Sequence, residues 1–195
     1  MSKYDYLSSL TRLADAQMRV SLMLKNELCN DKGESVLQIS DLNRQSNSLC
    51  AEIDSALFEE FLPPIERVSI SECAHGLNEI IGAAFELSSF LGAAERVSRR
   101  SAICEEMSVC AELAEMIYVA AVFLAQKNSR AALPDTYAFR LCLNKGSGVH
   151  STFAARTSFS DTRRDLGALI NAIEYYRRTL ARVYDKIIEA ILYNV

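Results

Sequence analysis

Apolar residues recur every three or four positions along most of the chain, a spacing that gathers them on one face of an α-helix. The longest such run covers residues 162–193, with apolar positions at Leu166, Leu169, Ile170, Ile173, Leu180, Val183, Ile187 and Ile191. A second run, over 34–61, places on one seam Ile39, Leu42, Ser46, Leu49, Ile53, Ala56 and Glu60. The two-residue alternation of a half-buried strand is found nowhere. The pattern therefore predicts an all-α protein.

Turn-forming residues divide this pattern into six predicted helices. Asn30–Gly33 supplies a turn after the first helix. Pro63-Pro64 ends the second, because proline lacks a backbone donor and restricts the residue before it. Lys145–Gly148 interrupts the fifth. The expected helices cover approximately 4–29, 34–61, 69–91, 98–127, a short helix from 135, and 162–193.

The third predicted helix has features that weaken it in isolation. Ser69 or Ser71 can cap its start, with the Glu72 carboxylate in its first turn. Its apolar face comprises Leu77, Ile81, Ala84, Ser88 and Leu91. Three glycines lower its intrinsic helix propensity, namely Gly76, Gly82 and Gly92. We therefore expect this helix to depend on close packing against its neighbours.

The length of 195 residues is sufficient for a substantial core, either as one domain or as two closely packed halves. Connections are short except over 128–160, where the helical pattern is weakest. Six helices suit a three-plus-three arrangement. We predict one helical domain over 1–195, with approximate halves 1–97 and 98–195.

Composition excludes several classes of function. A formal net charge of −4 lacks the concentrated basic surface that binds nucleic-acid phosphates. The longest apolar run, Met116–Ala125, has ten residues and is followed by Lys127, whereas a membrane-spanning helix needs about 18. The first residues lack the apolar core of a secretory signal. We therefore expect a cytoplasmic protein without a membrane span and without a nucleic-acid partner.

The cysteines point to packing more than to a covalent or metal framework. The chain has six, at Cys29, Cys50, Cys73, Cys104, Cys110 and Cys142. No two of them have Cys-x-x-Cys spacing, and most fall within apolar helical patterns. We interpret them as small buried residues of a protein from a reducing compartment, with a disulfide or zinc framework as the alternative.

The proline break carries a resemblance to a known family. The stretch Phe61-Leu-Pro-Pro-Ile-Glu-Arg-Val-Ser-Ile70 follows a long helical pattern and precedes another that contains Leu77-Asn-Glu. It resembles the PhoU-like phosphate-transport regulators, especially the accessory proteins of low-affinity phosphate transporters, whose matching stretch reads approximately Phe-Ile-Thr-Pro-Ile-Asp-Arg-Glu-Asp-Ile. The resemblance covers roughly residues 4–96, extends to the fourth and last predicted helices, and is poor over 128–160.

The resemblance implies a six-helix fold of two packed three-helix bundles, each able to hold a multinuclear metal cluster on acidic motifs. Carboxylates four residues apart share a helix face and bind hard cations. In this chain the first motif falls on Asn43 and Asn47, and the second falls on Asn78 and Gly82. Amides cannot neutralise a multivalent cluster, and glycine offers no ligand. We therefore expect that the first-bundle cluster has been lost.

Other candidate metal ligands surround the first of two histidines. Glu72 and His75 have the Glu-x-x-His spacing of di-iron bundles, but the chain has no second such motif. The weak candidates for a single partial metal face, for a divalent or trivalent ion, are His75, Glu79 and Glu86. An ordinary polar face is the preferred interpretation, and we expect no cofactor.

Catalytic motifs are not recognisable in the sequence. Neither histidine has a nucleophile setting, and Lys145-Gly-Ser-Gly148 does not have the order of a phosphate-binding loop. The last helix carries a basic stripe of Arg178, Arg182 and Lys186 at four-residue spacing. A solvated face balanced by neighbouring acids is the default interpretation, and a docking surface for an anionic partner is the alternative. Glu174 and Arg178 are expected to form an ion pair.

From the resemblance we expect a non-enzymatic, cytoplasmic regulator of phosphate transport that acts by protein–protein contact. Its partner would be a phosphate transporter or that transporter's signalling partner, so the protein would be at most peripheral to the membrane. A homodimer is expected, because apolar positions occur on more than one helix face. Two alternatives remain: a metal-binding helical-bundle enzyme or metal buffer, and a diverged scaffold without a transport role.

Overall fold

The computed structural model describes residues 4–30, 35–90, 100–126, 135–145 and 162–194, and these residues form an all-α bundle. The helices are α1 (Tyr6–Asn30), α2 (Ser35–Glu59), α3 (Arg67–Ser88), α5 (Arg100–Gln126), α6 (Thr136–Lys145) and α8 (Thr162–Asn194). The predicted fold class is confirmed, and the described part of the chain contains no strand.

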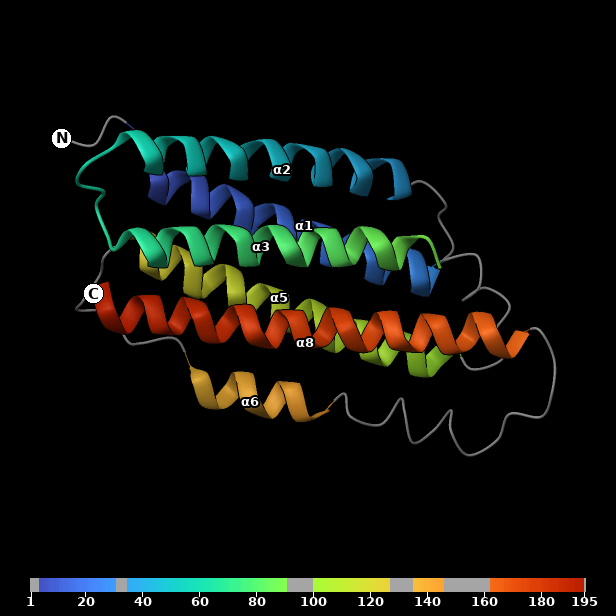
Figure 1. The fold of residues 1–195 in the computed structure, drawn as a ribbon. Helices are drawn as coiled ribbons and strands as arrows, with labels where there is room; N and C mark the ends of the chain where they lie inside the picture. The colour runs from blue at the N-terminus through green and yellow to red at the C-terminus, as the bar shows by residue number, and fades with distance from the viewer. Residues whose placement is uncertain (1–3, 31–34, 91–99, 127–134, 146–161, 195) are drawn as a thin grey trace.

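The five long helices run nearly side by side, and the short α6 lies along the bundle's outer face (Figure 1). Each of the first three helices contacts the other two, while α5 contacts both α6 and α8. The two groups meet where α1 packs on α5 and α3 packs on α8. The contacts between the groups are extensive, so their cores merge into one.

Buried positions follow the predicted faces closely. The core side of α2 consists of Ile39, Leu42, Ser46, Leu49, Cys50, Ile53 and Leu57. Leu57 is buried in place of Ala56, which is half-buried. The α-helix has 3.6 residues per turn, so its buried face shifts gradually relative to a pattern of alternating three- and four-residue steps. In α8 the predicted face is buried from Leu169 to Ile191. Leu91 and Gly92 of the third predicted helix lie outside the described residues.

Aspartate caps the starts of α1 and α6. Asp5 Oδ1 accepts the Ser8 backbone N–H at 3.0 Å, and Asp135 Oδ1 accepts the Ala138 N–H at 2.8 Å. The Asp135 cap confirms the predicted start of the short helix. The predicted start of α3 is wrong, because the helix begins at Arg67 with Glu66 as its cap and no side-chain capping bond. Continuation of the helix to Arg67 leaves Glu72 beyond the first turn.

The apolar length of α5 is greater than the sequence estimate. Residues Ser101–Gln126 form a helix that is long and apolar enough to cross a membrane by length and composition, even with its acidic residues included. The ten-residue estimate stopped at the first acid and is corrected by this finding. Half of this apolar stretch is buried inside the bundle. The helix alone therefore gives only weak evidence on location.

Close approach of α3 to α8 depends on one glycine. A Cβ on Gly76 would lie 3.0 Å from Cγ2 and 3.2 Å from Cγ1 of Val183, which is fully buried. Gly82, two turns along the same helix, has nothing within 4 Å of the same position. The expected close packing of α3 is therefore found at Gly76, where the absence of a side chain leaves room for Val183 of α8.

Replacement of the two glycines by alanine should have different effects on stability. Gly82→Ala should raise the free energy of unfolding by up to about 1 kcal/mol, because alanine is the better helix former. Gly76→Ala should gain the same propensity but lose about 1–3 kcal/mol to overpacking against the stiff, β-branched Val183. Urea denaturation of both variants measures the difference. Val183→Ala in the Gly76→Ala background should recover the stability lost to overpacking. If the changes in the free energy of unfolding of the two substitutions were strictly additive, the proposed contact would be contradicted.

Candidate functional site

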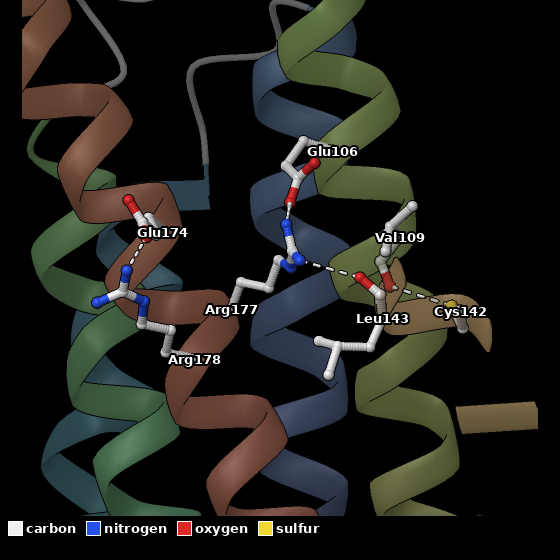
Figure 2. Close-up of polar contacts among 7 residues, drawn as sticks. All are labelled: Glu106, Val109, Cys142, Leu143, Glu174, Arg177 and Arg178. Carbon is white, nitrogen blue, oxygen red and sulfur yellow. Dashed lines mark hydrogen bonds and ion pairs between the residues drawn. The ribbon is translucent and has the colours of Figure 1, made fainter. Parts of the chain in front are cut away.

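A buried ion pair joins α8 to α5. Arg177 Nη1 donates to Glu106 Oε1 at 3.1 Å, and Arg177 Nη2 donates to the Leu143 carbonyl of α6 at 3.0 Å (Figure 2). The Glu106 side chain is 3% exposed and that of Arg177 is 21% exposed. One guanidinium therefore holds three helices together. Its planar fork of donors suits two acceptors at once.

The environment of Glu106 acts on its charge in two opposing ways. Burial raises the pKa of the Glu106 carboxyl above its ordinary value, and the nearby Arg177 cation lowers it again. Burial is the larger effect, so the pKa remains raised. The Cys110 thiol, one helical turn along α5, is also fully buried, and burial raises its pKa. The ion pair of Glu106 with Arg177 joins two helices inside the bundle, and we interpret it as a structural contact.

The basic stripe on α8 is balanced by acids on its own and neighbouring helices. Arg178 pairs with Glu174, which confirms the expected ion pair (Figure 2). Farther along, Arg182 pairs with Glu79, and Lys186 Nζ lies 3.1 Å from Glu72 Oε1 on α3. These pairs support the default interpretation of the stripe as a balanced face. They also place Glu72 and Glu79 against α8.

Amide groups meet where the resemblance expected acidic motifs. Asn78 Nδ2 donates to Asn47 Oδ1 at 2.9 Å, and Asn78 Oδ1 accepts the Ser46 hydroxyl at 2.6 Å. Ser46 Oγ is also 3.0 Å from the Asn43 carbonyl oxygen. Gly82 faces open space. Of the four positions counted from the proline break, Asn47 and Asn78 therefore meet between α2 and α3, and they hold neutral hydrogen-bonding groups.

The three predicted metal candidates do not gather in one place. His75 faces α2, where its ring lies between Cys50 and Asp54. Glu79 faces α8, where it pairs with Arg182 and accepts the Tyr175 hydroxyl at 3.1 Å. Glu86 is exposed two turns farther along α3. His150 lies outside the described residues.

His75 instead completes a cluster that the sequence analysis did not identify. Its Nδ1 lies 3.5 Å from Cys50 Sγ, and its Nε2 lies 3.1 Å from Asp54 Oδ1. One ligand atom from each residue lies within 4.8 Å of the other two. Cys50 and Asp54 are four residues apart on α2, a spacing visible in the sequence. Their partner could not be found from it, because pairing α2 with α3 at this level requires the tertiary structure.

His75 lies between Cys50 and Asp54, an order that resembles a nucleophile, its general base and an orienting acid. The surroundings of Cys50 argue against that chemistry. Cys50 is 4% exposed, and burial, with a smaller contribution from the Asp54 charge, raises the pKa of its thiol to about 11. A reactive cysteine needs a lowered pKa and an accessible sulfur. The cluster therefore does not support nucleophilic catalysis.

A groove lies between α1 and α2, beside one residue of α5. Its volume is about 380 Å³, within the range of ligand pockets. Its lining comprises Thr11, Arg12, Leu13, Asp15, Ala16, Arg19, Leu42, Gln45, Ser46, Leu49 and Tyr118. The lining contains neither histidine nor cysteine, and Asp15 lies 3.8 Å from Arg19. The groove thus offers shape and charge but no recognisable reacting group.

Removal of the buried guanidinium should be costly, whereas removal of its exposed neighbour should not. Arg177→Met leaves Glu106 buried without a counter-charge and should lower the free energy of unfolding by about 3–5 kcal/mol. Arg178→Met is the matched control and should cost less than about 1 kcal/mol, because its pair with Glu174 is exposed. Chemical denaturation compares the two. Equal losses would show that Arg177 has no special structural role.

The same variants should differ in their dependence on pH. In Arg177→Met the pKa of Glu106 should rise further, because the lowering cation is gone. In the unfolded state Glu106 has its ordinary pKa of 4.5. Over the pH range above that value, Glu106 of the folded variant therefore keeps its proton while Glu106 of the unfolded variant loses it. Stability of the variant therefore falls as pH rises through that window. Its deficit against the wild type should be small below pH 4.5 and full at neutral pH. A deficit independent of pH would contradict this account.

No protein-family model matches the chain, and no curated protein matches it. The residues of the proline break and the geometry of the described helices therefore carry what can be inferred about function. The features available are the balanced stripe, the amide contact, the Cys50–His75–Asp54 cluster, the groove and the exposed apolar surface described next.

Proposed function

We propose that this chain is a non-enzymatic helical regulator of phosphate transport that acts by protein–protein contact. The main support for this proposal is a group of large apolar side chains exposed at one end of the bundle. Phe58 is 92% exposed, Phe61 is 89% exposed and Leu62 is 76% exposed. These residues surround the proline break that resembles the PhoU-like regulators. We call them, with Val68, Leu192 and Tyr193, the end surface.

The end surface is drawn from two parts of the chain. Phe58 lies in the last turn of α2, and Phe61 and Leu62 follow that helix. The C-terminus of α8 lies at the same end of the bundle (Figure 1). Asn194 Oδ1 accepts the Glu66 backbone N–H at 2.7 Å, which ties α8 to the start of α3. Exposed aromatic side chains gathered in this way are typical of protein interaction sites.

Charge around the end surface suits a basic partner. Glu59 and Glu66 are exposed beside the aromatic residues, together with one cation, Arg67, whose guanidinium donates to the Glu60 carbonyl. An anionic lipid surface would be repelled by these carboxylates, whereas the cytoplasmic loops of a membrane transporter carry an excess of lysine and arginine. This complementarity supports a phosphate transporter as the partner and a cytoplasmic, at most peripheral, location for the chain. A second copy of the chain is the other proposed contact.

The amide contact supports the regulatory proposal over a metal enzyme of the resembled type. Asn78 Nδ2 donates to Asn47 Oδ1, so the amide oxygen that could serve as a ligand at Asn47 already accepts a hydrogen bond. A multinuclear cluster would need carboxylates at these positions. The proposal therefore assigns the Asn47–Asn78 contact a structural role and assigns partner binding to the end surface.

The end surface can be tested by exchange of its two phenylalanines. The wild-type chain, immobilised and exposed to detergent-solubilised native membranes, should retain a phosphate permease that mass spectrometry identifies. Phe58→Gln combined with Phe61→Gln should reduce that retention at least about tenfold, because aromatic anchors supply most of an interface's affinity. Thermal unfolding should change little, since both side chains are exposed in the free protein.

Tyr137→Gln is the matched control, because Tyr137 is an aromatic residue 72% exposed on α6, away from the end surface. It should retain the permease as the wild type does. Absence of a phosphate permease from the wild-type sample would overturn the transport assignment. Equal retention by the double variant would overturn the assignment of the end surface.

A further inference from the structure

The imidazole of His75 is held in a defined tautomer by its neighbours. Its Nε2 lies 3.1 Å from Asp54 Oδ1, and an ionised carboxylate only accepts hydrogen bonds. In this contact Nε2 therefore carries a hydrogen and donates a hydrogen bond to Asp54 Oδ1. The other nitrogen, Nδ1, then has a free lone pair directed toward Cys50 Sγ at 3.5 Å. A carboxylate that fixes a ring in this way is the usual outer partner of a metal-binding histidine.

The separation of the two inner atoms matches a metal coordination edge. Zinc binds sulfur at about 2.3 Å and imidazole nitrogen at about 2.0–2.1 Å with tetrahedral angles, which places the two ligand atoms about 3.5 Å apart. Cys50 Sγ and His75 Nδ1 are 3.5 Å apart. A metal ion could therefore bind both with little movement of either side chain.

We propose that Cys50 Sγ and His75 Nδ1 form a binding site for a zinc-type divalent cation, with Asp54 as the positioning residue for the ring. The thiolate and imidazole are ligands that favour zinc or cobalt over manganese or magnesium. Water completes the coordination, because His75 and Asp54 are about half exposed and leave the outer side of the site open. Metal binding removes the thiol proton that burial otherwise retains. This site is independent of the end surface.

Cobalt provides a direct test, since a cobalt–thiolate bond gives a charge-transfer absorption in the near ultraviolet. The metal-free full chain titrated with Co²⁺ should develop this absorption with one ion per chain, and zinc should abolish it by competition. Cys50→Ala should remove the absorption. His75→Gln, a change at an exposed side chain that does not threaten folding, should lower cobalt affinity at least about tenfold.

Asp54→Asn tests the positioning role. It should keep the thiolate absorption but weaken cobalt binding about 10–100-fold, as loss of an outer carboxylate does at other sites. Cys142→Ala is the matched control, because Cys142 Sγ is buried and lies 3.3 Å from a Glu112 carboxylate oxygen with no described imidazole beside it. This control should bind cobalt as the wild type does.

Three results would overturn the proposal. One is a wild-type chain without the thiolate absorption, and another is an absorption that persists in Cys50→Ala or disappears in Cys142→Ala. The third is binding of manganese in preference to zinc, which would indicate an all-oxygen site elsewhere. Unchanged cobalt affinity in Asp54→Asn would remove Asp54 from the site.

Discussion

The packing of α8 against both α3 and α5 is the constraint on which the arrangement of the described helices depends. On one side Gly76 lets α3 approach Val183 within van der Waals distance. On the other side Arg177 neutralises Glu106, an acid that burial alone would not tolerate in its charged form. The same guanidinium binds the Leu143 carbonyl and so positions α6. Steric fit and charge compensation thus act on two different faces of one helix.

The α2–α3 face shows how one helical framework can carry different polar chemistry. Near its middle, Asn47 and Asn78 satisfy each other by a direct hydrogen bond. About one turn nearer the proline break, Cys50 and His75 bring softer ligand atoms together. The Asn47–Asn78 contact places neutral amides where the resemblance implied acidic metal ligands. The Cys50–His75 contact places a thiol and an imidazole one turn away. Both depend on the same register between the two helices.

Much of the fold was predictable from periodicity, because burial of one face repeats every 3.6 residues and proline or glycine marks its interruption. The six helices of the described residues, and the buried faces of α2 and α8, follow from that rule. The start of α3 did not, since local serines suggested caps while the helix continued back to Arg67. The apolar length of α5 was underestimated, because two acids interrupt a sequence run without ending a buried helix.

The sequence by itself determined where helices form and which face of each is apolar, since both depend on interactions between near neighbours in the chain. Only the tertiary structure decided which polar groups meet. Arg177 and Arg178 are adjacent and identical, yet the first reaches Glu106, 71 residues away, and the second reaches Glu174, one turn away. His75 likewise contacts α2 instead of the acids on its own helix. These contacts depend on the rotation and register of each helix, and both are set by the packing of segments that are distant in the sequence.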